Sequence, residues 1–334
     1  MKEVSVFTHK ACLLHDTGAG HPEQRARLDG VIAALQQPAF STIDWQTNPP
    51  PATVAQLEYA HDPAYVQTAL AAAPSSGYVL LDADTVLSPH SVAAAVHAAG
   101  AVVAAVDAVL TGHSKKAFCA VRPPGHHAEK NTSMGFCLFA NAAIGGFHAV
   151  KAHGLQRVAI VDFDVHHGNG TAAIVDGHAE FLFASTHQHP FYPGTGAASE
   201  TGRLGNIINV PLAAGDGSVE FRDAFLNKIL PALDQFAPQL VIISAGFDAH
   251  KDDPLGQVNL TEADYVWVTQ ELQKIADTHG QGRIVSVMEG GYHLKALAFC
   301  VAAHVGTLMQ PGVGPSLRED LLKTSGNPSA APPL

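Results

Sequence analysis

The sequence contains few charged residues for its length. Charged side chains make up 15% of its 334 residues, whereas hydrophobic ones make up 47%. This composition excludes a disordered chain and is typical of a compact globule. The length suits one large α/β domain or two small ones, with enough core to fold without disulfide staples.

Cysteine is scarce as well, and neither a signal sequence nor a membrane span is visible. The cysteines are Cys12, Cys119, Cys137 and Cys300. Their scattered positions lack C-x-x-C spacing and predict no disulfide framework, so we expect a reducing compartment. Because no targeting segment is visible, we expect that compartment to be the cytoplasm. The start, MKEVSVFTHKA, lacks the apolar core of a signal peptide, and His97 and Asp107 interrupt the longest apolar run, Ala93 to Leu110. That run predicts a packed alanine-rich helix and no membrane partner.

Basic residues are outnumbered by acidic ones. The chain has 19 Lys and Arg against 30 Asp and Glu, a formal charge of -11 at pH 7 with neutral histidines. No basic patch is available to displace the counterions of a polyanion, which argues against nucleic acid as a partner. Cationic substrates remain compatible with this charge.

Short apolar runs and helix-like segments alternate along the chain. The strand-like runs are Val4 to Phe7, Ala117 to Val121, Val158 to Asp162, Phe181 to Ser185, Asn206 to Val210, Leu240 to Ser244 and Ile284 to Met288. The helix-like segments are Pro22 to Gln36, Ser91 to Leu110, Ser218 to Phe236, Thr261 to His279 and Leu294 to Leu308. Asp216 and Thr261 stand where helices would start. The alternation predicts a mainly parallel sheet with helices on both faces.

No composition break or repeat divides the chain, so we expect one α/β domain over residues 1–310. Residues 311–334 are rich in Pro, Gly and Ser. We expect this tail to lie along the surface or to be partly disordered.

Five of the predicted strands run into unusual polar loops. In chain order these are RPPGHHAE, DFDVHHGNG, THQHPFYPGTG, AGFDAH and EGGYH. Ligands of open α/β sheets collect outside the carboxyl ends of the strands, because loops converge there on a rigid support. The five loops therefore predict one site.

Asp164 and His166 are candidate metal ligands. If the chain stays extended after its strand, residues two apart project to the same side. For an isolated D-x-H, two loop caps would be the better interpretation, but Asp248 at another strand end offers a third ligand. Three protein ligands and an open fourth position suit a catalytic zinc ion, and Fe(II) or Co(II) also fits such a set.

The tandem His126 and His127 are candidates for proton transfer. A bare pair of histidines is more often core or surface, but this pair follows an Arg-Pro-Pro-Gly turn at a strand end. Imidazole titrates in the range needed to take a proton from water and to protonate a leaving amine. Asp162 is placed to orient one of the rings.

Tyr292 follows Gly290 and Gly291, whose small size lets the backbone bend closely around a site. A tyrosine packed under a loop is the simple alternative. Facing a metal, the phenol would donate a hydrogen bond to the oxyanion of a tetrahedral intermediate.

Taken together and in this order, these five motifs resemble the zinc-dependent deacetylases of the histone deacetylase and acetylpolyamine amidohydrolase family, which have the arginase-deacetylase fold. With GHPEQRARL near the start and MGFCLFANAA after the tandem histidines, the resemblance extends to about Leu308. HDTGAGHPE, Arg122-Pro123-Pro124 and Asn169 are similar to the class II branch.

The resemblance implies a role for each matching residue. Zinc would be held by Asp164, His166 and Asp248. His127 would act as general base and then acid, with His126 and Asp162 tuning the electrostatics and Tyr292 polarising the acetyl carbonyl. The acyl-lysine tunnel would be walled by Phe136, Tyr192, Leu255, Gly135 and Gly290, with Tyr192 at a position that is usually Phe in relatives.

Two further features follow from the resemblance. Asn169 stands where class I relatives have an Asp behind the second tandem histidine, and its lack of charge should lower the pKa of that histidine. A structural potassium ion near the zinc is implied by Asp162, Asp164, His166, Ser185 and Thr186.

The substrate is less constrained. Some acetylpolyamine-selective relatives have an acidic gatekeeper in a D-P-E-G segment, whereas this chain has Asp253-Pro254-Leu255-Gly256. The uncharged Leu255 favours acetyl-lysine, or a longer acyl-lysine, on a peptide or protein. A small acylated amine remains the alternative if another acid at the rim, Asp82 or Asp84, serves instead.

Three other interpretations rank lower. A ureohydrolase would need more Asp ligands for a pair of manganese ions, and a non-catalytic acetyl-lysine binding protein would not need every catalytic group. A purely structural role would not require buried His and Asp at several strand ends.

Overall fold

The structure is a computed structural model in which residues 2–310 are described. The expectation of a tail over 311–334 lies outside the described residues.

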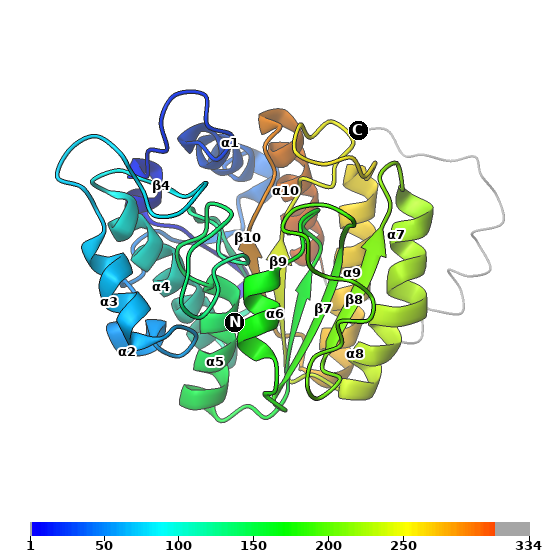
Figure 1. Cartoon of the computed structure of the whole chain (residues 1–334). Helices are drawn as coiled ribbons and strands as arrows, with labels where there is room; N and C mark the ends of the chain where they lie inside the picture. Colours follow the sequence, from blue (N-terminus) through cyan, green and yellow to red (C-terminus); the bar gives the residue numbers. More distant parts are fainter. Residues whose placement is uncertain (1, 311–334) are drawn as a thin grey trace.

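A sheet of eight parallel strands forms the centre of the molecule (Figure 1). Its strands are β1 (Lys2–Phe7), β2 (Asp44–Gln46), β5 (Ser114–Cys119), β6 (Val158–Asp162), β7 (Phe181–Gln188), β8 (Ile207–Leu212), β9 (Leu240–Ala245) and β10 (Ile284–Met288). They lie in the order β2-β1-β5-β10-β9-β6-β7-β8, and all neighbouring pairs are parallel. A separate antiparallel pair consists of β3 (Val79–Leu80) and β4 (Val86–Leu87).

The central strands are covered on both faces. Every residue of β6, β7, β9 and β10 is buried. Parallel strands that lie between two helical layers carry near-continuous apolar sequence, because neither of their faces meets water. The runs VAIVD, LVIISA and IVSVM follow this rule, and each contains a single polar residue.

Helices form the two covering layers (Figure 1). The helices are α1 (Arg25–Leu35), α2 (Val54–Leu57), α3 (Pro63–Ala71), α4 (Ser91–Leu110), α5 (Asn141–His153), α6 (Asn169–Val175), α7 (Ser218–Ala224), α8 (Leu230–Phe236), α9 (Glu262–His279) and α10 (Leu294–Leu308). Short 3-10 helices are η1 (Lys10–Leu14) and η2 (Pro38–Phe40), and η3 (Phe225–Ile229) is a π-helical turn. One continuous row packs α4 against α5 and α5 against α6, and another packs α1, α10, α9 and α8 in sequence.

The expected α/β fold with a mainly parallel sheet is confirmed, whereas several boundaries and elements differ. The segment Ser218–Phe236 is not one regular helix, because the π turn η3 interrupts it just before Pro231, which cannot donate a backbone hydrogen bond. Thr261 does begin a helix as its N-cap. Asp216 does not, because the N-cap of α7 is Gly217 and Asp216 instead accepts from the backbone of Ala213.

The most consequential element missing from the prediction is α5. Its sequence contains Gly145 and Gly146, which weaken helix propensity. Tertiary packing explains both glycines: a Cβ on Gly145 would lie 2.6 Å from Val102 Cγ1 of α4, and one on Gly146 would lie 2.7 Å from the Phe181 ring. The absence of side chains allows α5 to lie close to α4 and the sheet.

One helix among residues 2–310, α4, is long and apolar enough to cross a membrane by length and composition alone. In the fold, 61% of its most apolar window is buried. It packs on α5, β5 and β10 as a core helix, as its alanine-rich sequence predicts.

Candidate active site

The five unusual loops meet at one edge of the sheet. They follow β5, β10, β9, β6 and β7, which are five adjacent strands, although Thr186–Gln188 of the segment THQHPFYPGTG still belong to β7. Because all five run in the same direction, their carboxyl ends bring the loops together. A cavity of about 330 Å³ lies there, and its lining includes Gly135, Phe136 and Tyr292.

The three predicted metal ligands converge on one point. His166 Nδ1 lies 3.0 Å from an oxygen of Asp164 and 3.1 Å from an oxygen of Asp248. Both carboxylates have no exposed surface, and His166 faces the cavity. These three residues form one of the groups whose ligand atoms all lie within 4.8 Å of one another.

The local chain path differs from the expected one. Asp164 and His166 lie in a bend after β6, not on an extended continuation of the strand. The turn is closed by Asp164 Oδ1, which accepts from the backbone N–H of His166 at 2.9 Å. The second oxygen of Asp164 accepts from the N–H of Gly290 at 2.8 Å, and Asp248 Oδ1 accepts from the N–H of Val165 at 2.8 Å. Backbone donors therefore hold both carboxylates facing the imidazole.

The charges of this group suit a bound cation. Burial, followed by the nearby charge of Asp164, raises the pKa of Asp248 to about 7. Burial would lower the pKa of His166, but its hydrogen bonds to Asp164 and Asp248 prevail and raise it to about 10. The protonated ring of His166 thus supplies a positive charge between the buried carboxylates of Asp164 and Asp248. A divalent metal ion fits the same donor set and would replace that proton.

His126 and His127 come from the loop after β5 and have different surroundings. His126 Nδ1 lies 3.0 Å from Asp162 Oδ2, and its Nε2 lies 3.8 Å from Asp164 Oδ2. Burial lowers the pKa of His126, but the charges of Asp164 and Asp162 outweigh this and hold it well above its usual value. For His127, burial is the main reason that the pKa lies well below its usual value, and the charges of His126 and His166 act in the same direction.

The orientation of His127 is fixed through Asn169. The amide nitrogen of Asn169 donates to Glu129 Oε1 at 2.8 Å, because a carboxylate can only accept. The amide oxygen therefore faces His127 and accepts from its Nδ1 at 2.7 Å. This leaves Nε2 of the neutral ring without a proton. The hydrogen bond from His127 to Asn169 raises the pKa of His127, so burial and not Asn169 is the principal cause of its low value.

Tyr292 lines the cavity from the loop after β10. Burial raises the pKa of its phenol well above the usual value, so the hydroxyl stays protonated and can donate. Arg27 lies over the ring, 4.8 Å from its centre, and donates to the carbonyl of Gly291 at 2.6 Å. Asp253 accepts from the backbone N–H of Tyr292 at 2.6 Å. Hydrogen bonds to Arg27 and to Asp253 thus fix the loop that carries Tyr292.

Aromatic rings form much of the cavity wall. The ring of Tyr192 meets His127 edge to face at 5.2 Å, and Phe136 lies 6.0 Å from Tyr292. Phe191, which the sequence interpretation did not single out, stacks on His166 at 5.5 Å. An apolar wall of this kind suits an aliphatic chain.

The two glycines assigned to the tunnel have different places. Gly135 lines the cavity at φ 56°, and a Cβ there would lie 2.3 Å from the His127 ring. Gly290 is not among the lining residues: it lies behind Asp164 and Asp248, where a Cβ would be 2.1 Å from Asp248 Oδ2. The assignment of Gly290 to the tunnel is corrected accordingly, because its role is to admit a buried carboxylate.

Two residues of opposite character line the same cavity, Leu255 and Asp84. Leu255 is anchored by Asp253, which accepts from its N–H at 2.9 Å. Asp84 accepts from the Tyr192 hydroxyl at 3.1 Å and from the N–H of Gly135 at 2.8 Å. Asp82 instead binds Ser133 and is not part of the lining.

Buried charges beyond the predicted set support the site. Glu289 accepts from the backbone N–H groups of Gly125 and His126 at 2.7 and 3.2 Å, which shapes the turn before the tandem histidines. Glu23 receives a two-pronged contact from Arg122, with both distances 2.7 Å, and a third from Arg27 at 3.0 Å. The only sequence signal for these residues was their place inside quoted motifs, since a lone Glu or Arg carries no spacing pattern.

Comparisons with known proteins cover most of the chain. The profile of the histone deacetylase domain matches residues 21–308. The chain is 42% identical over 310 residues to the uncharacterised protein slr0245 of Synechocystis sp., covering 92% of this chain and 99% of that protein. It is 37% identical over 344 residues to the histone deacetylase-like amidohydrolase of Pseudomonas aeruginosa, covering 96% and 89%. The crystal structure of the HDA15 HD domain matches with a TM-score of 0.86 and 36% identity, covering 92% of this chain and 88% of that one. The chain belongs to the histone deacetylase family.

Proposed function

We propose that the protein is a zinc-dependent amidohydrolase that removes acetyl groups from lysine side chains. The observation that carries the proposal is the convergence, in one cavity of about 330 Å³, of His166, His127 and Tyr292. They supply a metal ligand, a proton acceptor and a hydrogen-bond donor.

Asp164, His166 and Asp248 would hold the ion, which when bound would polarise the substrate carbonyl and lower the pKa of water. His127 Nε2 accepts the proton of the attacking water, because its Nδ1–H is committed to Asn169. The Tyr292 hydroxyl donates to the oxygen of the tetrahedral intermediate. His127 then returns its proton to the departing amine, and the aromatic walls keep the aliphatic chain in line.

His126 has a positioning role in this scheme. Its contact with Asp162 at 3.0 Å keeps a positive charge beside His127, which disfavours a second proton on that ring. His127 therefore starts the reaction as a base.

A structural potassium ion near Asp162 forms part of the proposal. The register pairs Asp162 with Ser185 of the neighbouring strand, so carboxylate and main-chain oxygens gather there. Oxygen ligands of this kind suit a hard cation.

The substrate is proposed to be acetyl-lysine on a peptide or protein, because Leu255 gives the cavity wall no charge at this position. The carboxylate of Asp84 can accept N–H groups from a peptide backbone. The same carboxylate favours a second candidate, a small acetylated polyamine whose distant ammonium would pair with it.

Amine release from an acetyl-lysine peptide and from N-acetylputrescine tests the proposal. Zinc-reconstituted and metal-stripped protein are compared side by side. Zinc-dependent preference for the peptide supports it, whereas preference for the polyamine overturns the substrate assignment. Activity on neither substrate with fully loaded protein would contradict deacetylation.

The Leu255→Glu variant separates the two substrates. A carboxylate at this position of the cavity wall would meet a distant ammonium, so we expect higher kcat/KM on N-acetylputrescine. Leu255→Gln, equal in size and uncharged, is the matched control. An equal gain in both variants would refute a charge effect.

A further inference from the structure

A second cluster of metal-ligating side chains lies outside the active site, between two helices. We propose that Asp107, His148 and His153 form a second binding site for a divalent transition metal such as zinc. This inference does not depend on the proposed function.

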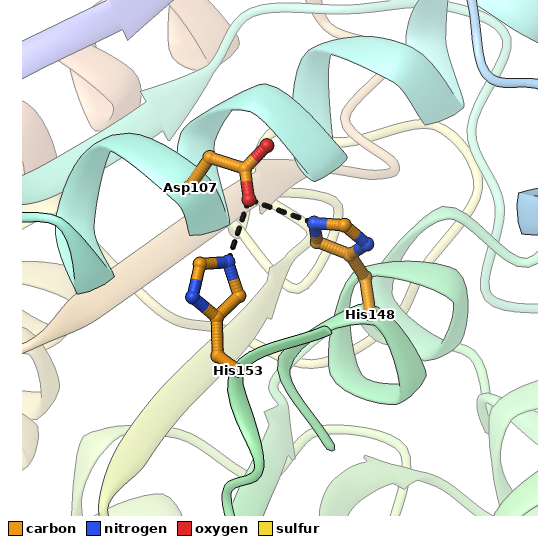
Figure 2. Close-up of side chains that lie close together, drawn as sticks. All are labelled: Asp107, His148 and His153. Atoms are coloured by element: carbon orange, nitrogen blue, oxygen red, sulfur yellow. Dashed lines mark hydrogen bonds and ion pairs between the residues drawn. The ribbon is translucent and has the colours of Figure 1, made fainter. Parts of the chain in front are cut away.

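The three side chains face one another (Figure 2). Asp107 lies in the last turn of α4, and both histidines lie towards the end of α5. Asp107 Oδ1 is 2.7 Å from His148 Nε2 and 2.6 Å from His153 Nε2. The three ligand atoms all lie within 4.8 Å of one another. Two imidazole nitrogens and a carboxylate oxygen are a set that zinc, copper and nickel accept.

The packing of α4 on α5 creates this meeting point. The missing side chain of Gly145 allows close approach to Val102, one turn or more before Asp107 along α4. Helix α5 then ends at His153, because Gly154 has φ 70°. His153 is therefore at the helix terminus, where its ring reaches the same carboxylate as His148.

The distances from Asp107 Oδ1 to the two imidazoles are shorter than those between neighbouring ligands of one metal ion. Each imidazole donates Nε2–H to one carboxylate oxygen, which gives hydrogen-bond lengths. Around a tetrahedral zinc, with bonds of about 2.0–2.1 Å, neighbouring ligand atoms lie about 3.3 Å apart. The carboxylate would therefore retreat by less than 1 Å, and each ring would carry its proton on Nδ1 instead of Nε2. The Asp107 side chain is 48% exposed and free to make this shift, whereas His148 is 9% exposed and held in place.

Two features set the expected strength of the site. The chain carries a formal charge of -11, which favours cations in general. His148 Nδ1 is buried without a hydrogen-bond partner in the described part of the chain, so no outer acceptor strengthens this ligand. We therefore expect weaker binding here than at Asp164, His166 and Asp248, whose carboxylates are held by backbone donors.

A metal at this position would link α4 to α5. The other end of α5 reaches the active-site loops, where the Asn141 amide donates to the carbonyl of Pro123 at 3.3 Å. Binding would thus stabilise the helix that supports the turn before His126. The expected effect is on thermal stability, with no direct part in the reaction.

Metal stoichiometry tests the proposal. Metal-stripped protein is titrated with Zn²⁺, passed through a desalting column and measured by elemental analysis. Asp107→Asn keeps the hydrogen-bond acceptor but removes the charged ligand, and His153→Ala removes a partly exposed ligand. His113→Ala is the matched control, because His113 and Asp44 form another His–Asp contact, of 2.9 Å, that belongs to none of the three-ligand groups among residues 2–310.

We expect Asp107→Asn and His153→Ala each to bind one equivalent less than the unaltered protein, while His113→Ala binds the same amount. The Tm increase that follows addition of Zn²⁺ should shrink in the same two variants. An unchanged stoichiometry in both would overturn the proposal, whatever the deacetylase activity. Circular dichroism of each variant establishes that a missing ion does not reflect a missing fold.

Discussion

Metal binding at Asp164, His166 and Asp248 should release a proton and become tighter as the pH rises. The two carboxylates raise the pKa of His166 to about 10, although burial opposes this. At neutral pH the metal-free site therefore holds an imidazolium. A metal needs the neutral ring, so binding must first displace that proton.

The size of this pH effect on metal affinity follows from the difference between the working pH and the pKa of His166. At pH 8, deprotonation of a group with a pKa of about 10 costs roughly 3 kcal/mol, at about 1.36 kcal/mol for each pH unit. The apparent Kd should therefore fall roughly tenfold for each unit between pH 7 and 9. Below about pH 7 the slope should steepen, because Asp248, with a pKa raised to about 7, is then also protonated.

The stability of the metal-free protein should change in the opposite direction. A raised folded-state pKa of His166 gives stability that is fully present below its unfolded value of 6.5 and is lost as the pH rises through about 10. The ionisation of Asp248 adds to this loss between its unfolded value of 3.8 and about 7. The Tm difference between zinc-loaded and stripped protein should thus widen from pH 6 to pH 9.

Calorimetric titration with Zn²⁺ in two buffers of different ionisation enthalpy measures both Kd and the protons released. The Asp107→Asn background keeps the second candidate site from contributing. We expect at least one proton released per ion at pH 8. A Kd independent of pH between 7 and 9, with no proton released, would refute the argument that an imidazolium occupies the centre of the site.

Three further predictions concern catalysis and stability. Tyr292→Phe should lower kcat by about 10²–10³ with little change in KM, as for other lost oxyanion donors, and an unchanged kcat would exclude that role. Glu23→Gln leaves buried arginines without their counter-charge and should lower the free energy of unfolding by about 3–5 kcal/mol in urea denaturation; a loss below about 1 kcal/mol would contradict it. Asn169→Asp, combined with Glu129→Gln to avoid two facing carboxylates, should raise the pKa of His127 and move the acid limb of kcat/KM to higher pH. An unmoved limb would show that another group controls it.

Much of the fold was predictable because the central strands have unusually clear sequences. Strands such as Val158–Asp162 and Ile284–Met288 are buried throughout, and their boundaries coincide with the apolar runs. Helix α5 was not predictable in this way. Its two glycines lower local propensity, and their packing against Val102 and Phe181 appears only in three dimensions.

The site, too, was predictable only in part from the sequence. The convergence of Asp164, His166 and Asp248 could be predicted, since each follows a strand and parallel strands end together. The residues that fix protonation could not, because they act across long sequence distances.

Glu129 is the clearest case. It lies 40 positions before Asn169, in no recognised spacing, yet its carboxylate decides which way the Asn169 amide points. That orientation puts the proton of neutral His127 on Nδ1 and leaves Nε2 free to accept. The family resemblance suggests His127 as the base, whereas only the folded chain explains why its ring presents an unprotonated nitrogen to the cavity. Glu129 does not line the cavity. Its replacement should nevertheless change the reaction rate, because it acts on His127 through the orientation of Asn169.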